Sequence, residues 1–447
     1  MTVARVAREV AEGARRAARR AARVVTHPLW GELAAPVIRV TGFYVRGRQR
    51  WRSPREPGRA MPVVRPGFTL VAQAAIDEVV LATARIGRRP RSQAEFMSIE
   101  VEVAEALVQF AAAGWLDDPA SYHEKPPPPE EVREHTSRFG SADYVRIEFE
   151  SEYEPHPGEP GRDRWLEDVP NRTSYAWVLR HPEPRPWLVC VHGAGMGLPL
   201  IDLRAFRAEW LHEELGLNLA FPVLPRHGPR REGLPFGVGF PDDDLLDNVH
   251  ALAQAAWDVR RLIAWLRTTQ QAEVVGLKGI SLGGYVASLV ACLEDDLACV
   301  MVGVPAVDFA DLFERHAPAR FRSRPGYERL VPMSREIHRV VSPLAIAPLP
   351  PRERRFIYAG IDDRLVHPRA HVEVLWRHWD EPSIAWFEGS HVGFFFSRPV
   401  VDFVAAALRL SGLAAGEHEH EVGADSVVTL AAAEGPEAGT NTRGGQR

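Results

Sequence analysis

The spacing of apolar residues changes near residue 143 and divides the chain into two patterns. Upstream, apolar residues recur at three- and four-residue steps over 72–86 and 99–115, which predicts two helices. Downstream, short β-rich runs alternate with helical stretches, and this alternation predicts an α/β fold around an open, mostly parallel, doubly wound sheet. We expect strands over 187–191, 217–224, 273–280, 298–304, 355–359 and 383–388, and helices over 246–267, from 282 onward, and over 368–379 and 400–410.

Other segments carry separate signals. The runs 144–153 and 173–180 predict an antiparallel hairpin at a sheet edge. The proline tract 126–129 cannot continue a helix and marks a linker, and a long insertion from 308 predicts a lid. We therefore divide the chain into a basic arm, 1–60; a helical region with the Pro-rich linker, 61–142; an α/β core, 143–411, with its lid at about 308–340; and a disordered tail, 412–447.

The composition is that of an ordinary globular protein, with 447 residues of which 45% are hydrophobic and 25% charged. No apolar run approaches the roughly 20 residues that span a bilayer, and the basic N-terminus lacks the pattern of a secretory signal. Cys190, Cys292 and Cys299 lie in apolar runs and are expected to be buried, reduced thiols. We therefore expect a cytoplasmic protein.

The formal net charge of −5 averages two unlike parts of the chain. Residues 1–60 hold 14 Arg and four Glu, so this arm carries +10 and the remainder carries −15. Arginines at helical spacing within 1–26 predict a cationic amphipathic helix, for which peripheral contact with an anionic membrane is one interpretation. Its apolar face is mostly alanine and would insert weakly, so we favour a solvated or flexible arm over membrane contact. No nucleic-acid-binding module accompanies the charge, and nucleic acid is not an expected partner.

The sharpest motif is Gly-Ile-Ser-Leu-Gly-Gly at 279–284, which follows a β-rich run and opens a helix. A serine on so tight a strand-to-helix turn projects at the carboxyl edge of the sheet, and small neighbours relieve the crowding. The amino end of the helix adds free N–H groups and positive potential. We therefore interpret Ser281 as a nucleophile in preference to an ordinary turn serine.

A second glycine-rich turn, Val-His-Gly-Ala-Gly-Met-Gly at 191–197, follows the predicted strand 187–191. A phosphate-binding turn is the alternative, but the sequence is neither a Walker A loop nor a complete GxGxxG motif. Together with the serine turn, it predicts an oxyanion hole made by the backbone N–H groups of Ala194 and Leu282.

A serine nucleophile needs a base to take its proton and an acid to orient the base. His391, in a small-residue turn after the strand 383–388, is the candidate base. Asp363, which follows the strand 355–359, is our choice of acid because its carboxylate can turn back toward His391. Asp362 is the near alternative, and Asp308, after the strand 298–304, is a third candidate.

The order Ser281, Asp363, His391, preceded by His192-Gly193, resembles the α/β-hydrolase superfamily of esterases, lipases and peptidases over about residues 143–411. The glycine-rich turns around the serine and the histidine match it as well. Within the superfamily, the motifs at 225–231 and 279–285 are similar to ABHD-type hydrolases thought to act on lipids. The resemblance implies the α/β-hydrolase fold and a triad that works without a cofactor.

Two further segments have alternative interpretations. The loop 227–240 should reach the rim of the active site, where Arg226, Arg230 and Arg231 would bind a substrate carboxylate or phosphate, although a solvated basic loop is an equal alternative. The aromatic residues of the lid could line an acyl pocket, but we favour packing among the lid's own helices. No histidine or cysteine spacing indicates a metal site.

The sequence therefore predicts a serine hydrolase that cleaves a carboxylic ester, with a lipid among the candidate substrates, through an acyl-enzyme. One alternative is other chemistry on the same scaffold, namely an acyltransferase, a C–C bond hydrolase or a haloperoxidase. The other is a catalytically silent protein that docks to a membrane or a partner, against which the complete set of three residues argues.

Overall fold

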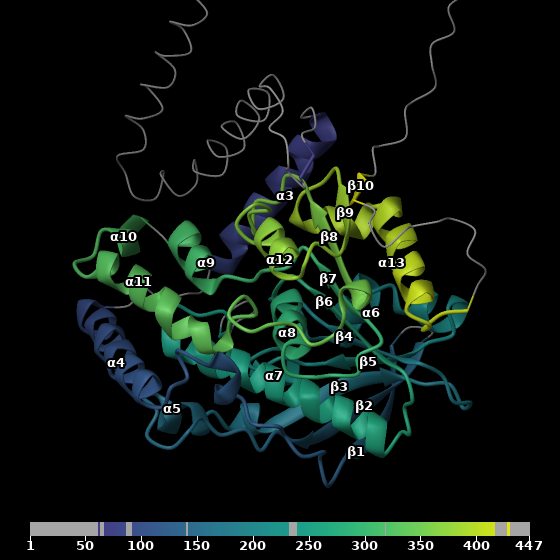
Figure 1. Ribbon diagram of the computed structural model, residues 1–447, viewed down its shortest axis with the longest axis horizontal. Coiled ribbons are helices and arrows are strands. Elements are labelled where there is room, and N and C mark those ends of the chain that lie inside the picture. The colour runs from purple at the N-terminus through teal and green to yellow at the C-terminus, as the bar shows by residue number, and fades with distance from the viewer. Residues whose placement is uncertain are drawn as a thin grey trace, which may run out of the picture.

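The computed structural model describes residues 61–62, 67–85, 92–139, 142–231, 239–317, 319–415 and 427–429. The basic arm 1–60 with its predicted cationic helix, and most of the predicted tail 412–447, lie outside the described residues. Within them, the strands form one sheet in the order β1-β2-β3-β5-β4-β6-β7-β8-β9-β10, with helices on both faces (Figure 1).

The centre of the sheet is parallel, as the sequence predicts. Its strands, in spatial order, are β5 (Asn218–Pro222), β4 (Trp187–Val191), β6 (Val275–Ile280), β7 (Val300–Gly303), β8 (Arg355–Gly360) and β9 (Ser383–Phe387). Every residue of β4 is buried, and its side chains alternate between two hydrophobic clusters: Val189 joins one and Leu188 and Cys190 join the other. Burial on both faces explains why such strands read as continuous apolar runs.

The antiparallel edge differs from the prediction in one respect. β2 (Ala142–Glu150) and β3 (Thr173–Leu179) are antiparallel, as expected, and β3 pairs antiparallel with β5. A further strand, β1 (Arg133–Phe139), pairs with β2, so the expected edge hairpin lies one strand inside the edge. The prediction missed β1 because its residues are mostly exposed and polar, without the alternation that marks a half-buried strand. At the opposite edge, β10 (Val427–Thr429) runs parallel to β9.

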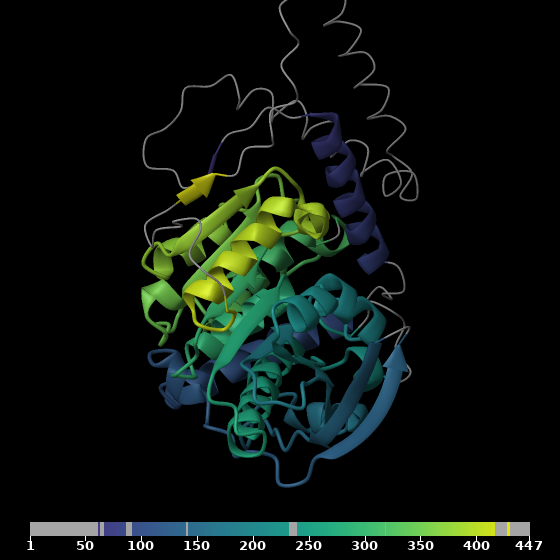
Figure 2. The same ribbon diagram turned by 90° about the vertical axis from the view of Figure 1, so that its right-hand side faces the viewer.

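Helices cover the two faces of the sheet as two separate layers (Figures 1 and 2). One layer contains α7 (Leu245–Thr268), α8 (Leu282–Ala291) and α12 (Val372–His378), and α13 (Arg398–Leu410) and α6 (Pro199–Ala205) belong to the other. The short elements are η1 (Pro119–Tyr122), α5 (Arg162–Leu166), η2 (Val169–Arg172), η3 (Trp210–Glu214), η4 (Gly228–Arg231), η5 (His338–Val341), η6 (Arg352–Arg354) and η7 (His391–Phe396).

The two predicted N-terminal helices are confirmed as α3 (Phe68–Arg85) and α4 (Gln93–Ala112). α4 begins earlier than predicted because a capping box starts it: the Ser92 hydroxyl accepts the Glu95 amide at 3.2 Å, and the Glu95 carboxylate accepts the Ser92 amide at 2.6 Å. The buried face of α4 packs against α7 and belongs to the same hydrophobic cluster. α3 lies apart from it, against η7.

The insertion after β7 folds into helices. α9 (Phe309–His316), α10 (Ala319–Arg322) and α11 (Tyr327–Ile337) follow one another, and α11 packs against both α9 and α4 (Figure 1). Within the described ranges, none of the helices has the length and apolar character needed to cross a membrane.

Candidate active site

Ser281 occupies a strained turn between β6 and α8. Its backbone has φ +55° and ψ −115°, a conformation that L-residues adopt only where the surroundings enforce it. The glycines of the motif make this possible: a Cβ at Gly279 would lie 2.1 Å from the Gly283 carbonyl oxygen, and one at Gly283 would lie 2.0 Å from the Val191 carbonyl oxygen. The motif is therefore a tight elbow pressed against β4, and it presents Ser281 at the carboxyl edge of the sheet.

Three of the predicted site residues form one line of hydrogen bonds. His391 Nε2 lies 2.9 Å from Ser281 Oγ, and His391 Nδ1 lies 2.6 Å from Asp363 Oδ2. The other Asp363 oxygen accepts the amides of Leu365 at 2.9 Å and Val366 at 2.8 Å, which fixes the carboxylate. Asp363 follows β8 and His391 follows β9, so the parallel strands deliver all three side chains to one edge of the sheet.

The electrostatic surroundings of His391 favour its protonated form. Burial alone would lower the pKa of the imidazole, but the charge and hydrogen bond of Asp363, together with the charge of Asp77, raise it above its ordinary value. An imidazole with this environment stabilises the positive charge that it would acquire on taking a proton from Ser281.

The two alternative acids have other positions. The Asp308 carboxylate caps α9 by accepting the Asp311 amide at 2.9 Å. Asp362 lies in the turn after β8, where its amide donates to the Gly389 carbonyl at 3.1 Å. The carboxylate that contacts the His391 ring is that of Asp363.

The glycine-rich turn after β4 packs directly on the serine elbow. A Cβ at Gly193 would lie 3.4 Å from the Ser281 Cβ. The adjacent His192 is fully buried, and burial lowers its pKa to about 4, so the ring is neutral. Since the Leu224 amide must donate to Nε2 at 3.1 Å, Nδ1 carries the proton and donates to the Gly193 carbonyl at 2.8 Å. His192 thereby fixes the turn to the end of β5.

A buried carboxylate holds the other end of this turn. Asp202, on α6, accepts the Gly197 amide at 3.0 Å and the Trp177 indole N–H at 3.1 Å. Burial raises the pKa of Asp202 to about 7. The Ala194 amide, in this turn, and the Leu282 amide, at the start of α8, donate no hydrogen bond to any residue that the structure describes.

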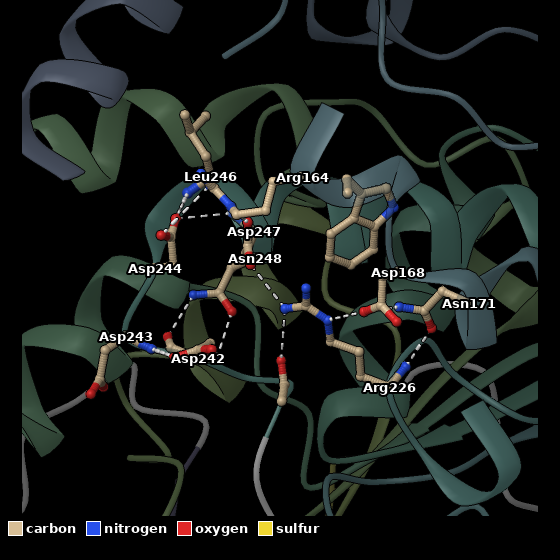
Figure 3. Close-up of polar contacts among 12 residues, drawn as sticks. Arg164, Asp168, Asn171, Arg226, Asp242, Asp243, Asp244, Leu246, Asp247 and Asn248 are labelled. Atoms are coloured by element: carbon tan, nitrogen blue, oxygen red, sulfur yellow. Dashed lines mark hydrogen bonds and ion pairs between the residues drawn. The ribbon is translucent and has the colours of Figure 1, made fainter. Parts of the chain in front are cut away.

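The predicted substrate-binding arginines are already engaged by the protein. Figure 3 shows the Arg226 guanidinium between Asp168, at 2.8 Å, and Asp247, at 2.9 Å. Arg230 is fully buried and pairs with Asp258 at 2.8 Å. These two side chains join the segment after β5 to the rest of the fold, in place of the rim position that the sequence suggested. Arg231 is partly exposed at the end of η4.

The aromatic residues of the insertion pack mainly against neighbouring helices. Phe321 of the insertion contacts Phe96 of α4, with ring centroids 4.9 Å apart, and Phe313, at 5.6 Å. Phe309 packs edge-on against Tyr285 of α8, at 5.0 Å. These contacts favour the packing interpretation over an acyl pocket.

One segment at the site went unnoticed in the sequence. Asp77, in the middle of α3, is fully buried, and its carboxylate accepts the backbone amide of His391 at 3.0 Å. The available signal was weak: Asp77 and Glu78 form an acidic pair inside an otherwise apolar helical stretch. Such a pair usually lies on a solvent-exposed face.

The comparisons with known proteins give one close relationship. No family model matches the sequence. The chain is 49% identical over 375 residues to the uncharacterized protein MT2702 of Mycobacterium tuberculosis strain CDC 1551 / Oshkosh, across 83% of this chain and 90% of the relative. The uncharacterized protein Rv2627c of strain H37Rv gives the same identity and coverage.

Solved structures are similar at much lower identity. Acetyl xylan esterase 1 from Thermoanaerobacterium sp. is 15% identical with a TM-score of 0.45, across 66% of this chain and 98% of that chain. An acetyl xylan esterase from Paenibacillus sp. R4 is 13% identical with a TM-score of 0.46, across 67% of this chain and 93% of that chain.

The fold and the site identify the superfamily by themselves. A serine elbow after a central parallel strand, followed in chain order by an aspartate and a histidine that join it in one hydrogen-bonded line, is the arrangement of α/β-hydrolases. At 49% identity over 83% of its length, the chain belongs to the family of these two mycobacterial proteins, and its own fold is that of the α/β-hydrolases.

Proposed function

We propose that this protein is a serine hydrolase that cleaves a carboxylic ester through an acyl-enzyme. The observation that carries the proposal is the line from Ser281 Oγ through His391 to Asp363, with distances of 2.9 Å and 2.6 Å. A serine hydroxyl is a weak nucleophile until a base within hydrogen-bond reach takes its proton, and this geometry supplies one.

In the first half-reaction, Ser281 Oγ forms a bond to the ester carbonyl carbon while its proton passes to His391 Nε2. The carbonyl π electrons move to the oxygen, and the amides of Ala194 and Leu282 donate to the resulting oxyanion. The intermediate collapses as the ester C–O bond breaks, and His391 returns the proton to the departing alcohol. Asp363 keeps the imidazole oriented and stabilises its charged form.

In the second half-reaction, a water molecule gives a proton to His391 and attacks the acyl carbon. This attack forms a second tetrahedral oxyanion at the same position. The bond to Ser281 Oγ then breaks, the carboxylic acid leaves, and the proton returns to the serine. Over the whole cycle, one water molecule is consumed for each ester cleaved, Ser281 and His391 return to their starting protonation states, and no redox step occurs. The strained backbone of Ser281 keeps its side chain in position throughout.

Labelling with a fluorophosphonate probe tests the proposal, because such a probe reacts only with an activated serine. We expect the wild type to be labelled on Ser281, Ser281→Ala to lose the label, and His391→Ala to label at least about 1,000-fold more slowly. Ser288→Ala is the matched control: Ser288 lies on α8 in the same motif region, with its hydroxyl bonded to the Gly284 carbonyl, and the variant should label as wild type. A wild type that does not label, or a Ser281→Ala variant that labels equally fast, overturns the proposal.

Hydrolysis of p-nitrophenyl esters of increasing acyl length, with the matching anilides, tests the substrate class. The proposal expects turnover of at least one ester and far slower cleavage of its anilide. Turnover confined to anilides would contradict the ester assignment while leaving Ser281 as the nucleophile.

A further inference from the structure

We infer that Asp77 on α3 is a positioning residue of the active site, holding the His391 loop against the Asp363 loop and placing a second negative charge beside the imidazole. The inference rests on the proposed function of Ser281, His391 and Asp363. It makes the helix α3, which ends 48 residues before the first strand of the sheet begins, a working part of the site.

The Asp77 carboxylate joins two loops that leave different strands. One oxygen accepts the His391 amide and the Arg364 amide, both at 3.0 Å. The other accepts the Ser390 hydroxyl at 3.0 Å and the Val392 amide at 3.4 Å. Arg364 follows the acid Asp363 directly, and the other three donors surround the base. The single, fully buried Asp77 side chain therefore sets the position of the Asp363 loop relative to the His391 loop.

α3 adds contacts from two nearby positions, one turn before Asp77 and directly after it. The Gln73 side-chain oxygen accepts the Ser390 amide at 3.0 Å, and Glu78 pairs with the Arg364 guanidinium at 3.2 Å. Two glycines of this loop lie next to the same side chain: a Cβ at Gly393 would lie 2.6 Å from the Gln73 side-chain oxygen, and one at Gly389 would lie 2.9 Å from it. The glycines of the Gly-Ser-His-x-Gly motif thus leave room for the Gln73 side chain.

The attachment of α3 is mainly polar. Its buried apolar residues in the described part of the chain, Leu70 and Ala74, form a small cluster separate from the two main cores. Ile76 and Val79, on another side of the helix, are 47% and 61% exposed. A helix that contributed only to stability would bury such side chains in a core. α3 instead contacts the Asp363 loop and the His391 loop through its own polar side chains.

The charge of Asp77 affects the base as well as its position. Asp77 raises the pKa of His391, in addition to the larger effect of Asp363. Burial raises the pKa of Asp77 itself, and the neighbouring Asp363 charge adds to that rise, while the His391 charge and the amide donors oppose it. Loss of the Asp77 charge should therefore lower the pKa of His391, a change that a purely structural role would not produce.

The test measures the second-order rate constant of fluorophosphonate labelling as a function of pH for the wild type, Asp77→Asn and the control variant Glu105→Gln. An asparagine amide can accept with only one of its two terminal atoms, so it cannot receive all four donors. We expect Asp77→Asn to label about 10- to 100-fold more slowly on the alkaline plateau, with the midpoint of the acidic limb at a lower pH than in the wild type. Glu105→Gln removes an exposed carboxylate from α4, away from both loops, and should leave the rate and that midpoint in place.

Ser390→Ala provides a second variant in case Asp77→Asn does not fold. It removes one hydroxyl donor to Asp77 and should slow labelling by about three- to tenfold. A wild type that fails to label at Ser281 overturns the proposed function, and this inference with it. If the wild type is labelled, the inference alone is overturned in either of two cases. In the first, Asp77→Asn folds and keeps the labelling rate and the acidic midpoint of the wild type. In the second, Asp77→Asn does not fold and Ser390→Ala keeps the wild-type labelling rate.

Discussion

The substitution Asp363→Asn changes one atom of the buried carboxylate, and the structure determines how the new amide must turn. In the wild type, one Asp363 oxygen accepts the amides of Leu365 and Val366, at 2.9 and 2.8 Å, while the other faces His391 Nδ1 at 2.6 Å. The two backbone donors require an oxygen, so the asparagine must present its NH₂ group to the imidazole.

An NH₂ group facing Nδ1 reverses the tautomer of His391. Nδ1 must then accept, so the proton moves to Nε2, which lies 2.9 Å from Ser281 Oγ. A protonated Nε2 cannot take the serine proton. In a serine protease with the same arrangement this tautomer error lowers the rate by about 10⁴, equivalent to about 5 kcal/mol of transition-state stabilisation. We expect a loss of that order here, with little change in folding stability because the side-chain shape is kept.

The assay compares wild type, Asp363→Asn and Asp362→Asn by fluorophosphonate labelling rate and by hydrolysis of a p-nitrophenyl ester. Asp362 is the matched control, since it is the adjacent residue of the same type and the Asp363 carboxylate is the one that contacts the ring. An Asp363→Asn variant within tenfold of the wild type, or an equal loss in Asp362→Asn, would show that Asp363 is not the residue that orients the His391 imidazole.

The pH profile, the elbow and a buried ion pair give three further predictions. Because the pKa of His391 is raised and the base must be neutral, ester hydrolysis should fall as the pH drops through a midpoint above the ordinary value of histidine, and a midpoint below it would contradict the account. Gly283→Ala should abolish labelling or soluble expression, since its Cβ would lie 2.0 Å from the Val191 carbonyl oxygen, whereas Gly67→Ala, with open space around it, should behave as wild type. Arg230→Met should lower the urea-derived free energy of unfolding by about 3–5 kcal/mol because it leaves Asp258 buried without its ion-pair partner. The same change at Arg335, which is 61% exposed, should cost less than about 1 kcal/mol, and equal losses would count against the buried pair.

The parallel strands were predictable because two-sided burial imposes a composition that the sequence displays. β4 is apolar at all five positions and was predicted with its observed bounds. β1 was not predictable in this way, since an exposed edge strand satisfies its backbone through β2 and needs no apolar side chains. The chain order of Ser281, Asp363 and His391 was readable because parallel strands bring their carboxyl ends to one edge.

The remaining parts of the site depend on contacts between distant segments. From the sequence, Arg230 was expected on a basic loop at the rim of the active site, although it is fully buried. Its ion-pair partner Asp258 lies on α7, and the local sequence around Arg230 does not indicate that contact. Asp77 lies 314 residues before His391, and nothing in the local pattern of α3 indicates which loop its carboxylate meets. Such pairings follow from the packing of the fold, which periodicity and motifs do not specify.

In the proposed mechanism, Ser281 carries the acyl group of the substrate as a covalent intermediate. This intermediate can be trapped by acid quenching within the first turnover of an ester and located by intact-mass and peptide mass spectrometry. We expect one acyl group per chain, located on the peptide that contains Ser281 and absent from Ser281→Ala. Ester turnover with no acyl group on the chain, or with the acyl group on another residue such as Cys190, would contradict this mechanism.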